Sequence, residues 1–159
     1  MLEYLQITFK ASCDDDRDSD AEPGDSCSPE DPSPYVHLAA PEEDVANMVD
    51  AEQVVIPRAS IRVAVDYPLR EEHVFTLNSN DSAGFRRGEL ALKIAQLYQR
   101  IYAEEERSSA EPAGLVPGLL NRTRTEGTYG IWGHDISDLD LVGVVHKPLR
   151  DVWVLEVDS

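Results

Sequence analysis

A run of fourteen residues, 125–138, contains the side chains best suited to chemistry, and we call it the Gly-aromatic loop. It reads Thr-Glu-Gly-Thr-Tyr-Gly-Ile-Trp-Gly-His-Asp-Ile-Ser-Asp. Its glycines permit unusual backbone angles and the close approach of a partner. Tyr129 and Trp132 each offer a large contact surface with one polar group. The loop could therefore line a binding surface. The alternative is that both aromatic residues fill the core beside a helix while the glycines make tight turns.

A His-Asp pair in this loop raises the question of a metal site. Imidazole and carboxylate groups together suit zinc, manganese or iron, and His134, Asp135 and Asp138 would supply them. Their spacing matches no established metal motif, however. The sequence favours the alternative in which Asp135 and Ser137 cap a turn and His134 bonds to a neighbouring backbone group. His134 also lacks an acidic partner that would orient it as a general base. We therefore predict no metal and no cofactor, and we assign no catalytic residue.

Two arginines precede the aromatic residues. Arg122 and Arg124 carry planar guanidinium groups, which recognise carboxylate or phosphate. With Arg86 and Arg87 at the expected start of a helix, they could form an anion site that the helix N-terminus strengthens. The alternative is that exposed arginines balance nearby acids. The candidate residues for binding a ligand or partner are Arg122, Arg124, Tyr129, Trp132, His134 and Asp135.

The acidity of the chain is concentrated near its beginning. The formal net charge is -17, and residues 11–52, with fourteen acids and one base, account for -13 of it. Residues 53–159 carry only -4. Such a charge repels DNA and RNA at long range, which disfavours direct nucleic-acid binding.

Residues 11–34 are rich in Asp, Ser and Pro and contain almost nothing apolar. A stretch of this kind cannot bury enough apolar surface to offset its ordering entropy, so we expect a mobile acidic loop. Its only cysteines, Cys13 and Cys27, are too few for a disulfide framework or a four-ligand zinc site, and a reduced compartment is the simplest interpretation. The acids at 14–20 lack the glycine and closing glutamate of a calcium loop.

A helix is predicted from about Arg86 to Arg107, because apolar residues recur there at helical spacing. The stripe consists of Leu90, Ile94, Leu97, Tyr98, Ile101 and Tyr102. The glutamates at 104–106 lie where the helix dipole disfavours them, so we expect a frayed, solvated terminus.

Alternation of apolar and polar residues predicts the strands. They lie at 2–9, 60–67, 73–77, 139–146 and 152–157, with a further short strand and a short helix indicated within 35–56. This order predicts one α+β domain spanning 1–159. We expect a mostly antiparallel sheet packed against one long amphipathic helix, with the acidic loop 11–34 inserted after the first strand.

No apolar run approaches the roughly 18 residues that span a bilayer, and residues 1–10 do not resemble a secretion signal. We therefore expect a cytoplasmic protein without membrane contact.

No P-loop, dinucleotide fingerprint, kinase signature, zincin motif or Gly-x-Ser-x-Gly elbow is present. This favours a non-enzymatic interaction domain that binds another protein through the Gly-aromatic loop, the acidic loop or both. A basic partner would suit the acidic loop. The alternative is a small-molecule-binding or hydrolase-like protein with its site at the helix start and residues 121–138.

Overall fold

Two strands near the end of the chain, β7 and β8, form the centre of the main sheet. In the computed structural model, which describes residues 5–10, 35–110 and 124–159, the strand order is β1-β7-β8-β4-β5. β7 (Asp140–Lys147) pairs antiparallel with β8 (Val152–Asp158), and β8 pairs in parallel with β4 (Ser60–Val65). The other pairs are antiparallel. The predicted α+β fold with a mostly antiparallel sheet is therefore confirmed.

Most of the remaining elements follow the predicted order with shifts at their ends, but the strands at 54–56 and 85–86 are not predicted by the sequence. The remaining elements are β1 (Gln6–Thr8), β2 (Val36–His37), α1 (Glu42–Ala46), β3 (Val54–Ile56), β5 (His73–Asn78), β6 (Phe85–Arg86), α2 (Arg87–Ser108) and the 3-10 turn η1 (Ile136–Asp138).

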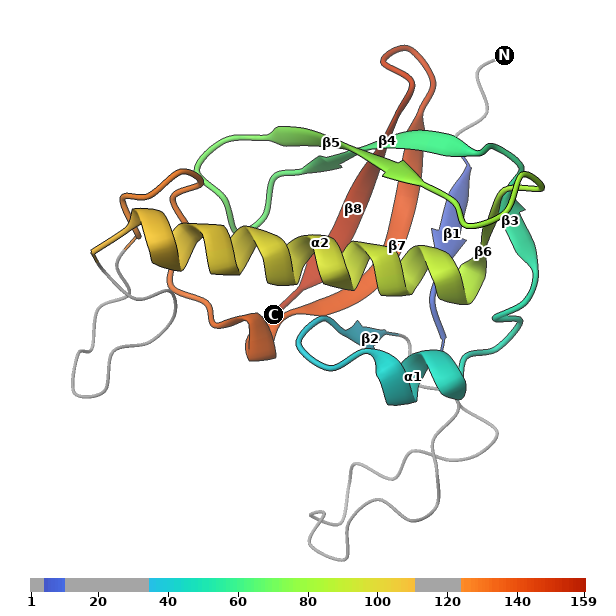
Figure 1. Cartoon of the computed structure of the whole chain (residues 1–159), viewed down its shortest axis with the longest axis horizontal. Coiled ribbons are helices and arrows are strands. Elements are labelled where there is room, and N and C mark those ends of the chain that lie inside the picture. Colours follow the sequence, from blue (N-terminus) through green and yellow to red (C-terminus); the bar gives the residue numbers. More distant parts are fainter. Residues whose placement is uncertain (1–4, 11–34, 111–123) are drawn as a thin grey trace, which may run out of the picture.

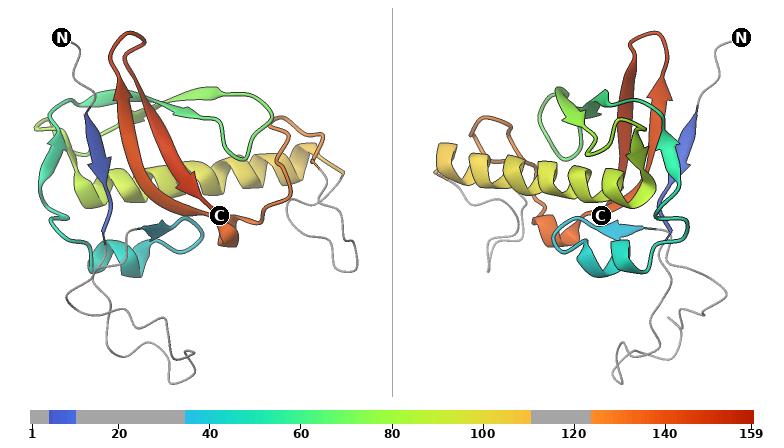
Figure 2. Two further views of the ribbon diagram at one scale, coloured as in Figure 1. Left: turned by 180° about the vertical axis from the view of Figure 1, so that it is seen from behind. Right: turned by 45° about the vertical axis from the view of Figure 1, so that its right-hand side comes forward.

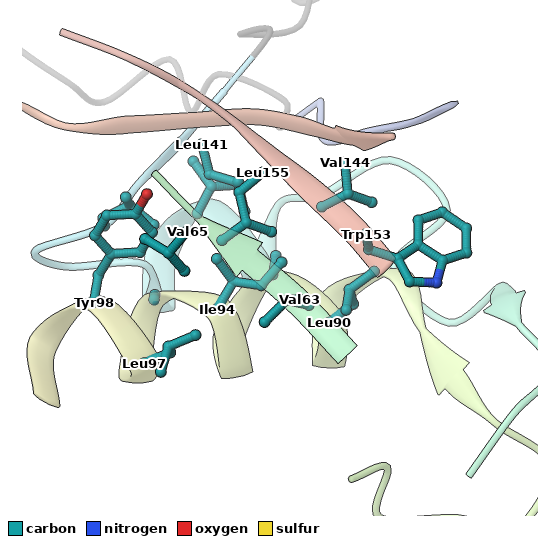
Figure 3. Close-up of a cluster of buried hydrophobic side chains, with 14 of the residues drawn as sticks. Val63, Val65, Leu90, Ile94, Leu97, Tyr98, Leu141, Val144, Trp153 and Leu155 are labelled. Atoms are coloured by element: carbon teal, nitrogen blue, oxygen red, sulfur yellow. The ribbon is translucent and has the colours of Figure 1, made fainter. Parts of the chain in front are cut away.

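The long helix α2 lies against one face of the sheet. Figure 1 shows it in front of β7 and β8, and the view from behind in Figure 2 shows these strands in front of the helix. The six residues of the predicted stripe are all buried, with at most 6% of each exposed. They form one cluster with Val63, Val65, Leu141, Val144, Trp153 and Leu155 of the sheet (Figure 3). Burial of this apolar stripe attaches the helix to the sheet.

Two short strands share the outer edge of β7. Thr8 of β1 lies opposite Gly143, and Val36 of β2 lies opposite Leu141. Both strands run antiparallel to β7, so β2 continues the line that β1 begins. Residues 11–34 connect these strands and lie outside the described residues. The end of β1 and the start of β2 thus lie at neighbouring positions along β7, which is consistent with an insertion between them.

A second, two-stranded sheet precedes α2 directly. β6 lies where the sequence predicts no strand, and it pairs with β3. Gly84 makes this contact possible. It has a φ of +118°, and a Cβ there would lie 2.2 Å from the carbonyl oxygen of Ile56. Only glycine fits so close to a neighbouring backbone at a positive φ.

Candidate functional site

The carboxylate of Glu105, near the end of α2, holds the Gly-aromatic loop in place. Its Oε1 accepts hydrogen bonds from the Thr125 hydroxyl at 2.6 Å and from the amides of Gly127 at 2.8 Å and Gly130 at 3.2 Å. Its Oε2 accepts a further hydrogen bond from the amide of Tyr129 at 2.7 Å. Glu105 has no exposed surface. One helix side chain therefore satisfies three backbone donors and one hydroxyl of the loop.

The prediction of a solvated helix end is wrong for Glu105. Glu106 is exposed, as expected, but Glu105 is buried, and the neighbouring Glu104 accepts a hydrogen bond from the hydroxyl of Tyr129. Glu105 lies one helical turn after Ile101 and so continues the buried face of α2. A search for apolar periodicity cannot identify this position, because its partners are backbone amides of a distant segment.

Burial and hydrogen bonding shift the pKa of Glu105 in opposite directions. Burial disfavours its charged form, but the bonds from Thr125, Tyr129, Gly130 and Gly127 favour it, and the net result is a pKa below the ordinary value. The carboxylate is therefore ionised at neutral pH. Since an unfolded Glu has a pKa of about 4.3, the charge stabilises the fold above that pH. This stabilisation is lost as the pH falls through the lower pKa of the folded state.

The loop also bonds to itself. The amide of Thr125 donates to the carbonyl of Ile131 at 2.9 Å, and the amide of Ile131 donates to the hydroxyl of Thr125 at 2.7 Å. Two glycines are needed for this path. Gly130 has a φ of +68°, and a Cβ on Gly127 would lie 2.5 Å from Oε1 of Glu105. A side chain at either position would strain the loop or displace the carboxylate.

The two aromatic residues of the loop point in different directions. Tyr129 is 6% exposed and packs edge-on against His73, with ring centroids 5.0 Å apart. Trp132 is 43% exposed, and the guanidinium carbon of Arg124 lies 5.8 Å from its ring centroid, within cation–π range. The amide of Trp132 donates to the carbonyl of Pro68 at 2.9 Å. The core-packing alternative is thus confirmed for Tyr129 and wrong for Trp132.

His134, Asp135 and Asp138 do not converge on a common point. Nε2 of His134 lies 2.8 Å from the hydroxyl of Tyr67, in a buried position. The carboxylate of Asp135 accepts from the amide of Ser137 at 2.9 Å, and that of Asp138 accepts from the amide of Asp135 at 3.1 Å. These acids cap η1, which confirms the turn-capping alternative for Asp135. The contact of the His134 ring with Tyr67, a distant side chain, is not predicted by the sequence. Within the part of the chain that the structure describes, no three His, Cys, Asp or Glu residues are arranged to hold a metal ion.

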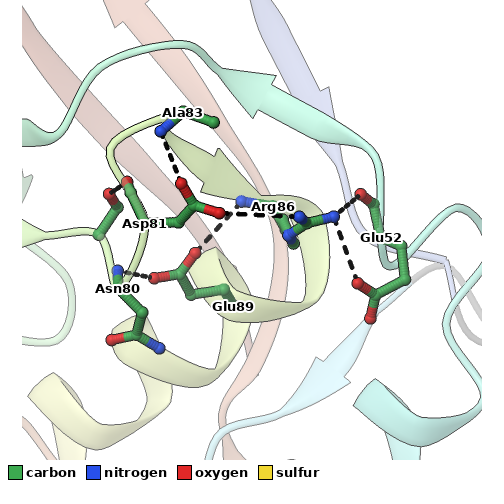
Figure 4. Close-up of polar contacts among 7 residues, drawn as sticks. Glu52, Asn80, Asp81, Ala83, Arg86 and Glu89 are labelled. Atoms are coloured by element: carbon green, nitrogen blue, oxygen red, sulfur yellow. Dashed lines mark hydrogen bonds and ion pairs between the residues drawn. The ribbon is translucent and has the colours of Figure 1, made fainter.

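The start of α2 is a separate polar cluster. The guanidinium of Arg86 donates to the carbonyl of Glu52 at 3.0 Å and lies 3.8 Å from the carboxylate of Asp81 (Figure 4). Glu89 accepts a hydrogen bond from the amide of Asn80 at 2.5 Å and also bonds to the amide of Arg86. The carboxylates of Glu52 and Asp81 already balance the charge of this guanidinium.

The structure does not bring together the two halves of the predicted anion site. α2 has 22 residues, and at 1.5 Å per residue its length is about 33 Å. The Gly-aromatic loop contacts its last turns at Glu105, whereas Arg86 and Arg87 lie at its beginning. Arg124 stacks on Trp132, and Arg122 lies outside the described residues.

His37 lies between two acids, an arrangement that the sequence does not predict. Nδ1 of His37 lies 2.7 Å from the carboxylate of Asp44, and its Nε2 lies 3.7 Å from that of Asp140. Burial raises the pKa of Asp140 above its ordinary value. The cluster links α1, β2 and β7. In the sequence, Asp44 has the ordinary role of an acid in a helix first turn, and nothing there indicates its partners.

No protein-family model, curated protein or solved structure matches the chain significantly. Of the helices in the described ranges, none is long and apolar enough to cross a membrane. The geometry of the residues must therefore carry the functional inference.

Glu105→Gln tests whether the carboxylate holds the loop. The amide has a single acceptor oxygen, and its NH2 group would face backbone donors. We expect the free energy of unfolding, measured by urea denaturation, to fall by about 1.5–3 kcal/mol, the range for hydrogen bonds to charged groups. Glu106→Gln, on the exposed neighbour, should change it by less than about 0.5 kcal/mol. Equal effects of the two substitutions would contradict the role of Glu105.

The same two variants test the charge state of Glu105. Between about pH 5 and pH 3, the wild type and Glu106→Gln should both lose stability as Glu105 takes up a proton, whereas Glu105→Gln should lose less. Melting temperatures recorded by circular dichroism across this range, at constant ionic strength, measure the difference. A Glu105→Gln variant with the same pH dependence as Glu106→Gln would show that Glu105 is not the titrating group.

Proposed function

We propose that the chain is a non-enzymatic protein-interaction domain that binds its partner through the Gly-aromatic loop. The observation that carries this proposal is the position of Trp132, which is 43% exposed on a loop whose backbone is bonded to its surroundings. Tryptophan and arginine are the residue types that contribute most to binding at protein interfaces. Trp132 and Arg124 stand side by side here, and their backbones form a β-bridge.

The preorganisation of the loop supports this proposal. Ordering a loop during association costs free energy, and a loop that is already ordered avoids that cost. The hydrogen bonds that Glu105 accepts from the loop provide this order. The cation–π contact between Arg124 and Trp132 also restricts both side chains before a partner arrives. Trp132 is therefore presented in one orientation, which favours specific recognition.

Charge favours a partner with a basic surface. The chain carries a net charge of -17, and most of it comes from residues 11–52. Complementary charge raises association rates and specificity more than it raises affinity. We assign recognition to the Gly-aromatic loop and electrostatic attraction to the acidic residues. The segment 11–34, which supplies much of the charge, lies outside the described residues, so its contribution is proposed from the sequence.

Trp132→Ala tests the recognition surface. Benzoylphenylalanine in place of Trp132 would first identify the partner by photo-crosslinking, and calorimetry with the purified partner would then measure affinity. We expect Trp132→Ala to weaken binding about 30-fold, the effect of a residue contributing about 2 kcal/mol. The melting temperature should stay unchanged.

Leu149→Ala is the matched control, since Leu149 is 85% exposed between β7 and β8. It should bind the partner as the wild type does. An unchanged affinity for Trp132→Ala, or an equal loss for both variants, would contradict the proposal.

Replacement of residues 12–33 by a short Gly/Ser linker tests the role of charge. The sheet should tolerate it, because Thr8 and Val36 pair with Gly143 and Leu141, which lie about 7 Å apart along β7. We expect slower association with the same partner at low salt, by about tenfold or more, and a smaller change in dissociation. Stopped-flow measurements at several salt concentrations report both rates. An unchanged association rate would remove residues 12–33 from the proposal.

A further inference from the structure

The sheet ends at β5, and a groove separates this strand from α2. No described strand pairs with the outer side of β5. The groove has a volume of about 340 Å³. Residues 76–78 of the strand line one side, and the helix lines the other with Lys93, Gln96, Leu97 and Arg100. In Figure 1, β5 lies above α2.

The outer side of β5 presents main-chain groups that are available for pairing. The amide of Ser79 donates to the carbonyl of Ala59, which is the residue opposite it in the antiparallel register. Bonded and non-bonded pairs alternate along antiparallel strands, so Val74, Thr76 and Asn78 direct their amides and carbonyls away from β4. These outward groups meet no hydrogen-bond partner among the described residues.

β5 also lacks the features that usually protect an edge strand. Its six residues, His-Val-Phe-Thr-Leu-Asn, include no Lys, Pro or Gly, and they pair with β4 without a bulge. Val74 is 46% exposed on the strand. The opposite edge of the sheet is formed by β1 and β2, which have only three and two residues. β5 is thus the regular, open edge that an extended segment could join.

The charge of the groove indicates which segment would join. Lys93 makes no ion pair with any described residue. The side chain of Arg100 is 57% exposed, lies over the ring of Phe75 at 5.6 Å, and is 3.9 Å from Glu104. In a chain with a net charge of -17, two cations therefore line the groove beside an open strand edge. Carboxylates at alternate positions of an added strand would face them.

We propose that β5 accepts an extended acidic segment of a partner protein as an additional strand. Main-chain hydrogen bonds to the outward groups of β5 hold the segment, and its carboxylates contact Lys93 and Arg100. This site is separate from the Trp132 surface and does not rest on the function proposed for that surface.

Three capped decapeptides test the proposal with the whole chain. The first alternates Glu and Val, the second alternates Lys and Val, and the third alternates Glu and Pro and so lacks half of the main-chain donors. Only the Glu-Val peptide should bind. At saturation it should slow amide exchange at Val74, Thr76 and Asn78 by about tenfold or more, as new hydrogen bonds do. The inward amides of Phe75 and Leu77 should keep their exchange rates.

Two substitutions at one position separate strand pairing from side-chain effects. Thr76→Pro removes an outward donor and leaves the pairing with β4 in place, whereas Thr76→Val keeps the donor. We expect Thr76→Pro to weaken binding of the Glu-Val peptide by about tenfold or more and Thr76→Val to bind as the wild type does. If Thr76→Pro does not fold, the double variant Lys93→Glu with Arg100→Glu gives the decisive measurement and should also lose binding.

Equal affinity for the Glu-Val and Lys-Val peptides, or full binding by the Thr76→Pro or the double variant, overturns the proposal. So does a peptide-free dimer that Thr76→Pro converts to a monomer, because a second copy would then occupy the edge. Trp132→Ala should bind the peptide as the wild type does. Failure at one surface can thus be told apart from failure at the other.

Discussion

The order of the Gly-aromatic loop depends on the hydrogen bonds that the buried carboxylate of Glu105 accepts. An ionised carboxylate without water is costly unless hydrogen-bond donors surround it, and here backbone amides and a hydroxyl do so. The exchange is mutual, because those amides would otherwise be buried without partners. Through the amide of Tyr129, the same carboxylate places an aromatic ring against His73 and Phe75 of β5. The helix end, the loop and the edge of the sheet therefore form one coupled unit.

The elements that the sequence predicts well are those whose pattern is local. Ile94 and its neighbours recur at helical spacing, and the helix they predict lies within one residue of α2 at both ends. The strands on either side of Pro68 follow from alternation and turn residues in the same way. β6 is missed because its two residues carry no periodicity. It exists because Gly84 lets the chain approach Ile56, and such a contact between distant segments has no local signal.

In the candidate site, too, local features are visible in the sequence, whereas contacts between distant segments are not. Trp132 stands out from composition alone, since an aromatic residue among glycines is conspicuous in any sequence. Its exposure does not follow from the sequence, because Tyr129, three residues earlier in the same loop, is buried. Glu105 and the pair of Tyr67 with His134 join segments that are far apart in the chain. From the sequence alone these side chains look like ordinary surface residues, because their partners become neighbours only in the folded structure.

β1 and β2 pair with adjacent parts of β7, so the architecture of the sheet does not depend on the length of the acidic connection between them. Because β1 and β2 occupy consecutive places on one partner strand, the closing entropy of the connection rises only with the logarithm of its length, about 0.6 kcal/mol per doubling. Evolution can therefore lengthen, shorten or recharge that connection at little cost to folding. The register of the sheet thus fixes where the connection begins and ends but does not restrict its length.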